Sequence, residues 1–266
     1  MRMLKIWRDI YWMVQNKLNK ESYANSRYSR FAAIPSIGAG GVDKIRKAKA
    51  TVVGAGGLGS VTAPQLVALG VKFLRIIDQD IVERSNLQRQ ILYRNNDIGK
   101  SKAEVAKKFL EELNPEVEIE AINDNITEKN AHTATDSVDF VVDAVDRFTP
   151  RFALNKACLE ENIPYLFGAV SGMSGNIMTV MRGATCVECI FSQADDSKLP
   201  TSLEVGIHPS IINIIGSLQI SEATRVMLKE EPLLLDKLHF CDIGTMQFET
   251  LNVKTRDDCF CSKYQK

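Results

Sequence analysis

Short apolar runs alternate with longer segments of helical periodicity along the chain up to residue 170. The apolar runs predict strands at residues 50–53, 73–78, 116–121, 140–144 and 165–170. The segments between them predict helices at residues 59–69, 100–113, 128–135 and 151–161. Strands that alternate with helices are typical of a parallel sheet, because each parallel connection needs a long crossover.

The pattern changes in the remaining part of the chain. Segments 176–183 and 239–253 alternate apolar and polar residues in the manner of antiparallel strands. Between them lie a polar loop, 192–206, and an apolar helix predicted at 208–229. We therefore expect an α/β fold with a Rossmann-like, mostly parallel sheet that antiparallel strands continue, and with helices on both faces. Since 266 residues without a repeat or a low-complexity linker fit one large core, we expect a single domain over residues 1–266.

Charge and hydropathy argue against two classes of partner. Lysine plus arginine and aspartate plus glutamate both number 33, so the formal net charge of zero gives no reason to expect nucleic-acid binding. Charged residues interrupt every long apolar stretch, so we expect no membrane-spanning helix. The amphipathic segment 1–15 contains Trp7, Tyr11 and Trp12, and we expect it to pack against the body or a partner, with membrane-surface attachment as the alternative. Charges interrupt this segment too, so we expect no secretory signal and a cytoplasmic protein.

Residues 51–80 have the pattern of a nucleotide-binding unit. A β-branched run ends in Gly54-x-Gly56-x-x-Gly59, a helical segment follows, and a second apolar strand ends at Asp78. The glycines permit a tight turn close to a phosphate, and the helix that opens there presents unpaired N–H groups. A carboxylate at the end of the second strand can accept hydrogen bonds from ribose hydroxyls. A glycine-rich turn alone occurs in many α/β proteins, but the strand, helix and acid in register favour a nucleotide site.

The next segment, DIVERSNLQRQ (80–90), argues against the dinucleotide that such turns usually bind. It contains Arg89, and Lys102 follows at the start of a predicted helix. An enzyme that transfers a hydride has little use for two cations beside the phosphates, whereas one that stabilises charge on a triphosphate needs them. Each residue alone would be read as a solvated side chain or a surface ion-pair partner, but SNLQRQ (85–90) is six consecutive residues and far more specific.

Several further motifs extend from residue 28 to residue 261. They are YSR (28–30), GAGGLG (54–59), DQD (78–80), SNLQRQ (85–90), GKSK (99–102), DAVDRFTPR (143–151), IGSLQISEA (215–223) and two cysteine pairs. On these motifs the chain resembles the MoeB/ThiF/HesA adenylyltransferases, which are related to ubiquitin-activating enzymes. The resemblance implies binding of Mg-ATP and adenylation of a carboxylate, usually the C-terminal glycine of a ubiquitin-fold sulfur-carrier protein.

The resemblance also implies roles for single residues. Arg89 and Lys102, with Asn86, face the triphosphate, and Asp146 is the magnesium ligand because it follows a strand at its carboxyl end. Asp143 and Asp80 are the alternatives to Asp146, and each has either a structural role or a role as a metal ligand. The residues expected at the nucleotide are Gly54, Gly56, Gly57, Gly59, Asp78, Asp80, Ser85, Asn86, Leu87, Gln88, Arg89, Lys102, Asp146 and Arg147. The family usually has asparagine in the place of Arg147, so the effect of this residue on adenine or substrate contacts stays open.

A fourth catalytic residue is expected from another subunit. In the family the arginine that corresponds to Arg30 reaches across a two-fold dimer into the ATP site of the partner. The resemblance therefore implies a homodimer. The apolar stretch IINIIGSLQISEA (211–223) fits an interface element and fits a buried helix equally well.

Two close cysteine pairs predict a metal site. Cys186-x-x-Cys189 and Cys259-x-Cys261 can provide four thiolates for a tetrahedral zinc ion, although scattered free thiols or a disulfide remain alternatives. Four sulfur ligands leave no open position, so the zinc would be structural and would clip the tail onto the body. The family normally has two residues between the last two cysteines, and here there is one. The other two cysteines, Cys158 and Cys241, are expected in the core.

The loop 192–206 determines which product is expected. In ubiquitin-activating enzymes and some sulfur-transfer relatives this loop has a cysteine that forms a thioester, whereas here Ser202 occupies that region. A serine hydroxyl without a partner base is a poor substitute. We therefore expect an acyl-adenylate as the product and a separate sulfur donor. The alternatives are a small-molecule or tRNA-linked carboxylate as substrate, a nucleotide-binding oxidoreductase, and a non-catalytic scaffold.

These assignments divide the expected single domain of the ThiF type into three parts. Residues 1–49 form an N-terminal helical arm, 50–170 the nucleotide-binding half, and 171–266 the substrate-facing half with the zinc clip. The expected cofactors are ATP, Mg²⁺ and Zn²⁺.

Overall fold

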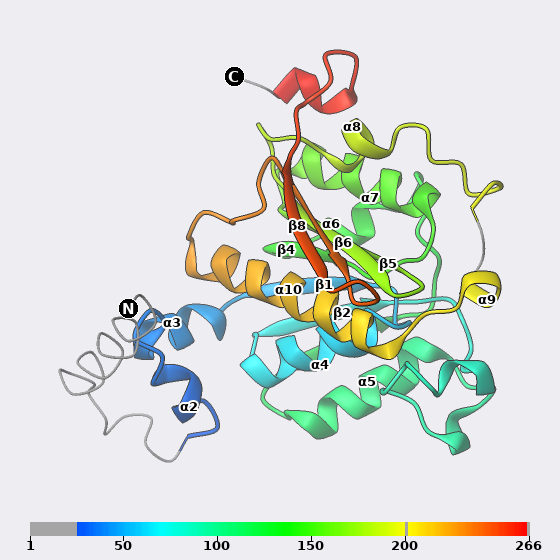
Figure 1. Cartoon of the computed structure of the whole chain (residues 1–266). Helices are drawn as coiled ribbons and strands as arrows, with labels where there is room; N and C mark the ends of the chain where they lie inside the picture. Colours follow the sequence, from blue (N-terminus) through cyan, green and yellow to red (C-terminus); the bar gives the residue numbers. More distant parts are fainter. Residues whose placement is uncertain (1–25, 200–201, 265–266) are drawn as a thin grey trace.

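One eight-stranded sheet runs through the computed structural model of the chain, which describes residues 26–199 and 202–264 (Figure 1). The strand order is β3-β2-β1-β4-β5-β6-β7-β8. Strands β1 to β5 pair in parallel, and β5 to β8 pair antiparallel. This mixed sheet confirms the predicted fold class. The strands are β1 (Lys49–Val53), β2 (Phe73–Ile77), β3 (Glu118–Ile122), β4 (Phe140–Asp143), β5 (Tyr165–Ser171), β6 (Ser174–Val180), β7 (Lys237–Asp242) and β8 (Gln247–Asn252).

Helices cover both faces of the sheet, as neighbouring residues on one strand show. Val52 packs into a cluster with α4 and α10, whereas Val53 packs into a second cluster with α6 and α7. In Figure 1, α10 and α4 lie in front of the sheet and α7 lies behind it. The α-helices are α2 (Ser29–Ala32), α3 (Gly38–Ile45), α4 (Gly59–Leu69), α5 (Lys102–Leu113), α6 (His132–Thr135), α7 (Phe148–Glu161), α8 (Val187–Phe191), α9 (Ser202–Val205) and α10 (Pro209–Leu228). Three 3₁₀ turns are η1 (Arg84–Asn86), η2 (Asn95–Asp97) and η3 (Phe260–Tyr264).

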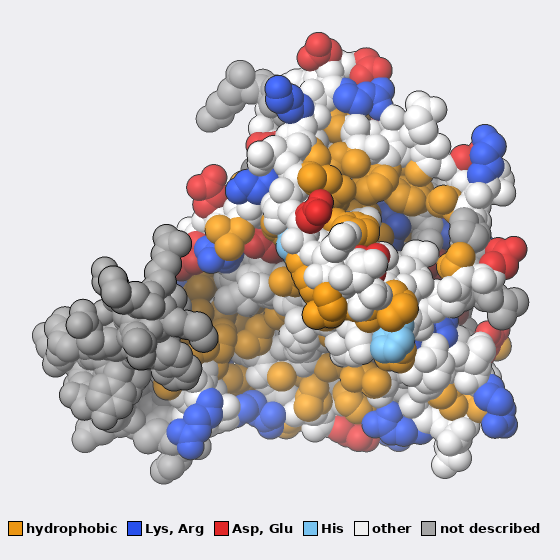
Figure 2. Space-filling model, in the orientation of Figure 1, with side chains coloured by type: hydrophobic (Ala, Val, Ile, Leu, Met, Phe, Trp, Pro, Cys, Tyr) orange, Lys and Arg blue, Asp and Glu red, His pale blue; other side chains and the backbone are white. Residues whose placement is uncertain are grey.

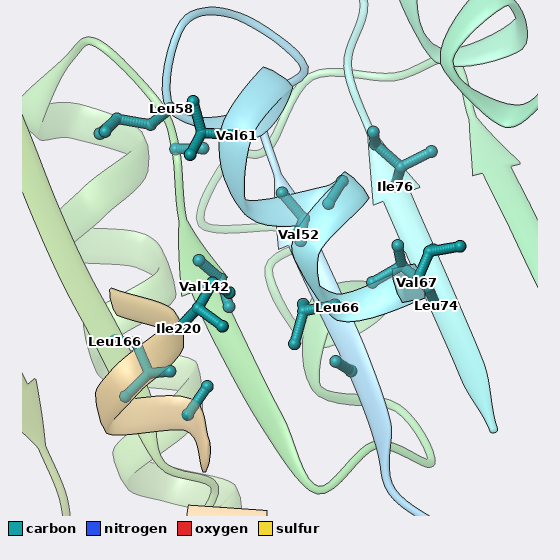
Figure 3. Packing of buried hydrophobic residues seen from close by; sticks show 14 of the residues in the cluster. Val52, Leu58, Val61, Leu66, Val67, Leu74, Ile76, Val142, Leu166 and Ile220 are labelled. Atoms are coloured by element: carbon teal, nitrogen blue, oxygen red, sulfur yellow. The ribbon is translucent and has the colours of Figure 1, made fainter. Parts of the chain in front are cut away.

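The larger core lies between the sheet and the helix that opens the nucleotide unit. Figure 3 shows Leu66 and Val67 of α4 over Val52 of β1 and Leu74 of β2, with Ile220 of α10 beside them. All but Ile220 are fully buried. Burying one such aliphatic side chain stabilises a protein by about 1.5–3 kcal/mol. The packing therefore fixes the start of α4, and with it the glycine turn, against the carboxyl ends of β1 and β2.

A buried ion pair fixes α7 against the end of β4. The Asp143 carboxylate, at the end of β4, accepts hydrogen bonds from Arg151 Nε (3.0 Å), the Tyr165 hydroxyl (2.7 Å) and the Val145 amide (3.0 Å). Burial raises the pKa of Asp143, and Arg151 and the other donors oppose that rise. Because both carboxylate oxygens have partners in the protein, this geometry favours the structural alternative for Asp143 over the magnesium alternative.

Two helices begin later than the sequence predicted, because polar side chains determine their first residues. The helix predicted over 128–135 is wrong in its first half, since α6 begins at His132. Asn130 accepts a hydrogen bond from the Thr127 amide (2.7 Å) and donates one to the Asn125 carbonyl (2.8 Å), so it forms a turn that competes with the helix. The helix predicted from residue 100 begins at Lys102, with Ser101 as its N-cap.

Other predicted bounds differ by a few residues. The helix predicted from 151 begins at Phe148 because Asp196 caps it from outside the helix. Strand β3 lies two residues later than predicted at its start, and β6 begins and ends earlier than the predicted 176–183. The alternating segment 239–253 belongs to two strands, β7 and β8, which form a hairpin. Cys158 and Cys241 are buried in the core as predicted.

No helix within residues 26–199 and 202–264 has the length and apolar character to cross a bilayer. The amphipathic segment 1–15, predicted to pack against the body or a partner, lies outside the described residues.

Candidate active site

The carboxyl ends of β1, β2 and β4 meet at the glycine turn. The Gly54 amide donates to the Ile77 carbonyl (2.8 Å), and a β-carbon at Gly54, whose φ is +98°, would collide with the Ala144 carbonyl. A β-carbon at Gly59 would collide with the Gly54 carbonyl, and one at Gly57 would lie 2.9 Å from the Ile212 side chain of α10. The approaches at Gly54 and Gly59 are to backbone atoms and require glycine, and the one at Gly54 places the turn against the segment that follows β4.

Asp78 connects two turns at this edge. One carboxylate oxygen accepts the Ala55 amide (2.7 Å) and the other accepts the Asp80 amide (2.7 Å). Burial raises the pKa of Asp78, while Lys102 and the two amides act in the opposite direction. Each carboxylate oxygen has a second lone pair, so Asp78 can still accept hydrogen bonds from a ligand hydroxyl.

Lys102 is a desolvated cation with an exposed counter-ion. Its Nζ lies 2.9 Å from a carboxylate oxygen of Asp80, and the side chains are 7% and 58% exposed, respectively. Its amide also donates to the Asp80 carbonyl (2.8 Å). An anionic ligand that reaches Lys102 therefore competes with a carboxylate that is free to turn into solvent.

The SNLQRQ motif folds around η1 and uses its polar side chains internally. Asn86 is buried, and its side-chain oxygen accepts the Glu83 amide (2.9 Å). Arg89 is half-buried and donates to the Ser85 carbonyl (2.9 Å). Ser85 and Gln88 are exposed, and Leu87 is half-buried. The motif thus holds the Arg89 guanidinium against the backbone of its own short turn.

Asp146 and Arg147 are exposed on the turn between β4 and α7. This turn is adjacent to the glycine turn, since Gly54 touches Ala144 and Val145. Within residues 26–199 and 202–264, no hydrogen bond or ion pair engages the Asp146 carboxylate. An exposed carboxylate with free lone pairs, at the edge where the strands end, fits a magnesium ligand.

Two residues of this site were missed by the sequence analysis. The Tyr93 hydroxyl donates to the Ala55 carbonyl in the glycine turn (2.6 Å), and burial together with Asp78 and Asp80 raises the pKa of Tyr93. Gln90 is 4% exposed, and its Oε1 has no partner in the described part of the chain. Gln90 is the last residue of the SNLQRQ motif but was given no role, and Tyr93 lies three residues after the motif, which was the available signal.

Arg30 lies far from the other predicted residues in the topology of the chain. It is exposed on α2, which Tyr28 anchors through hydrogen bonds to Glu116 (3.0 Å) and Asn114 (3.1 Å). Glu116 precedes β3, and Tyr28 also packs against Gly70, which precedes β2. These contacts put α2 at the amino ends of the strands, opposite the glycine turn of the same chain.

The four cysteines of the predicted metal site come together. Pairs of Sγ atoms lie 3.3 Å (Cys189 and Cys261), 3.5 Å (Cys186 and Cys259), 3.6 Å (Cys259 and Cys261) and 3.9 Å (Cys186 and Cys189) apart, and all four sulfurs lie within 4.8 Å of one another. Four thiolates at about 2.3 Å from a tetrahedral zinc ion lie about 3.8 Å apart. The single residue between the last two cysteines therefore does not prevent the arrangement, and the donor set fits structural zinc.

The cysteine cluster joins the C-terminal segment to the body. The Arg256 amide lies 3.5 Å from Cys189 Sγ, and η3 packs beside α7. Figure 1 shows η3 and α8 at the same end of the molecule. A metal at this place would hold the tail without touching the glycine turn.

Comparison with known proteins gives one consistent result. The model described as "ThiF family" matches residues 28–262. The SAMP-activating enzyme E1 of Haloferax volcanii is 36% identical over 234 residues, which cover 88% of this chain and 87% of that protein. The sulfur carrier protein adenylyltransferase of Thermus thermophilus is 35% identical over 240 residues, with coverage of 88% and 89%. The crystal structure of E. coli MccB with ATP has a TM-score of 0.79 at 27% identity and covers 91% of this chain and 76% of that one.

Tyr93→Phe should weaken nucleotide binding with little change in fold. The variant leaves the Ala55 carbonyl without its donor, and a net hydrogen bond of about 0.5–1.5 kcal/mol corresponds to a roughly two- to tenfold weaker affinity for ATP. Titration calorimetry with Mg-ATP measures the change. Tyr165→Phe, which removes a buried hydroxyl at Asp143, is the matched control and should lower the melting temperature without weakening ATP binding. Equal ATP affinity of Tyr93→Phe and wild type would contradict this role.

One zinc ion per chain should bind to the cysteine cluster. Metal analysis should find one equivalent, and chelation should lower the melting temperature because a structural zinc stabilises the folded state directly. Cys261→Ser should lose the metal, whereas Cys241→Ala, a buried cysteine outside the cluster, should retain it. Six freely titratable thiols in the native wild-type protein would show that the cluster holds no metal.

Proposed function

The chain belongs to the ThiF family, and we propose that it adenylates the C-terminal carboxylate of a ubiquitin-fold sulfur-carrier protein with ATP. The observation that supports this most directly is the convergence, at one sheet edge, of the glycine turn, Asp78, Lys102 and Asp146. The relatives from Thermus thermophilus and Haloferax volcanii are named for adenylating or activating such carriers. Their names favour adenylyl transfer over the oxidoreductase and scaffold alternatives.

The reaction requires alignment and charge neutralisation rather than covalent catalysis. A carboxylate oxygen forms a bond to the α-phosphorus, the bond from that phosphorus to the bridging oxygen breaks, and pyrophosphate leaves with the electron pair. The amides of the glycine turn face the phosphates, and Asp78 accepts the ribose hydroxyls. Lys102 and Arg89 offset the negative charge that develops on the departing pyrophosphate.

Asp146 is the residue assigned to magnesium. The ion supplies positive charge that neutralises the triphosphate when it is bound. Asp146 suits this role because it is exposed, lies next to the segment that Gly54 touches, and has no protein partner within the described residues. The pathway that uses the product, whether molybdopterin, thiamine or tRNA thiolation, is not assigned.

An exposed apolar surface supports a protein substrate over a small molecule. Side chains of the β7–β8 hairpin and of the neighbouring β5–β6 turn are exposed to solvent: Met173 (45%), Met246 (71%), Phe248 (46%) and Leu251 (51%). Figure 2 shows hydrophobic side chains among polar ones on the face formed by this hairpin and α10. Grouped apolar side chains on a surface are typical of a contact with another protein.

Two partners complete the proposal. A homodimer would bring Arg30 of one subunit to the nucleotide of the other, since α2 lies at the opposite edge from the glycine turn of its own chain. A separate sulfur donor would convert the acyl-adenylate, because the loop 192–206 contains no cysteine. We propose that the protein works in the cytoplasm, as this homodimer and together with the sulfur donor.

Asp146→Asn should abolish adenylation and leave the fold intact. The amide keeps the shape of the side chain but removes the charge that holds the cation. ATP–pyrophosphate exchange, measured with each candidate carrier protein of the same genome, tests both this role and the proposed function. Asp139→Asn, at the amino end of β4, is the matched control and should retain exchange. Full exchange by Asp146→Asn would refute the assignment, and no exchange by wild type with any carrier would refute the function.

The product should be a carrier acyl-adenylate without an enzyme thioester. Cys158 and Cys241 are buried, and burial raises the pKa of both thiols, so neither provides a reactive thiolate. The remaining four cysteines belong to the cluster. Mass spectrometry after incubation with ATP and carrier should find carrier-AMP and no thiol-sensitive adduct. A thiol-sensitive enzyme–carrier conjugate that disappears in Cys158→Ala or Cys241→Ala would disprove this.

A further inference from the structure

The N-terminus of α7 is capped by a residue that lies far along the chain. Arg147 occupies the N-cap position with an extended backbone, but its side chain makes no cap hydrogen bond. The Asp196 carboxylate takes this place: one oxygen accepts the Phe148 amide (2.7 Å), and the other accepts the Thr149 amide (2.9 Å) and the Thr149 hydroxyl (2.7 Å). Asp196 thus satisfies two of the free amides that begin a helix and places a negative charge at its positive end.

This cap holds the segment that includes the proposed magnesium ligand. The two capped amides belong to Phe148 and Thr149, directly after Asp146 and Arg147. The other end of the same turn is fixed by Gly54, which touches Ala144. Asp146 therefore lies on a short turn with one anchor on each side, and its own carboxylate is left for a ligand.

Asp196 itself belongs to a fixed segment. The ring of Phe191 lies 5.2 Å from that of Phe148 and 5.5 Å from that of Phe167. The Ala194 amide donates to the Phe191 carbonyl (2.9 Å), which continues the turn toward Asp196. Phe191 ends α8, and Cys186 of the cysteine cluster is the N-cap residue of that helix. The cap is consequently linked to the cluster through one short helix.

The carboxyl group that caps α7 is ionised. Burial opposes ionisation of Asp196, but the Thr149 hydroxyl, the two amides and the charge of Arg147 together lower its pKa. Asp196 is therefore a carboxylate at neutral pH and brings a full negative charge to the start of the helix.

We propose that Asp196 is a positioning residue of the adenylation reaction, which fixes the turn between β4 and α7 so that Asp146 meets the nucleotide. The inference rests on the proposed function. It assigns to Asp196 no contact with the substrate.

The test compares Asp196→Ala and Asp196→Asn with wild type in pyrophosphate exchange at varied Mg-ATP. Loss of a helix cap of this kind should raise the KM for Mg-ATP about tenfold in Asp196→Ala, with a smaller change in kcat. Asp196→Asn keeps one acceptor oxygen, so its KM for Mg-ATP should lie between the values of wild type and Asp196→Ala. Asp195→Asn is the matched control, because Asp195 binds Ser197 and Lys198 of its own turn, and it should leave both constants unchanged.

A merely structural cap would give a different result. It would lower the melting temperature of Asp196→Ala and leave the KM for Mg-ATP as in wild type, which would overturn the inference. If wild type exchanges no pyrophosphate, the proposed function fails, and Mg-ATP binding by calorimetry replaces KM. Equal binding by wild type and Asp196→Ala then overturns this inference separately.

Discussion

The contact between the Gly54 backbone and the Ala144 carbonyl is the constraint on which the site depends. No β-carbon fits between them, so the turn after β1 and the turn after β4 are held at one fixed separation. In the proposed reaction, the first turn presents amides to a phosphate and the second presents Asp146. Asp78 and Tyr93 hold the glycine turn from the side of β2, through the Ala55 amide and carbonyl. The glycine turn is thus preorganised by backbone packing and by these two side chains before a ligand arrives.

Sequence patterns predicted the strands, the long helices and the glycine turn, and missed several side-chain contacts. The strands and the long helices follow from apolar periodicity, and the glycine turn follows from spacing, because both are encoded within a few neighbouring residues. The start of α7 was misplaced since its cap comes from Asp196, 48 residues after the first capped amide. Asn130 shortened α6 by a side-chain turn that periodicity does not record. Tyr93 and Gln90 were missed because their importance lies in a contact with the glycine turn across the fold.

The cysteine cluster and the nucleotide site are separate in space but share one connecting element. Cys186 is the N-cap residue of α8, and the helix ends at Phe191, which packs on Phe148 at the start of α7. A cluster with four sulfur donors has no open position for chemistry, so its effect on the reaction is restricted to the placement of this helix. The buried pair of Asp143 and Arg151 fixes the other side of α7. Two polar anchors, one buried and one at the surface, thus determine where α7 begins.

Because Lys102 and Asp80 form an ion pair, an anionic ligand must replace a carboxylate rather than bind to an unpaired cation. Asp80 is a built-in counter-ion, so a phosphate that arrives at Lys102 replaces one anion by another and the local charge changes little. A ligand must therefore outcompete a carboxylate that is already within 2.9 Å, and an anion of low charge density gains little from the exchange. In the proposed reaction, this competition would favour the highly charged triphosphate over a singly charged anion at the same place.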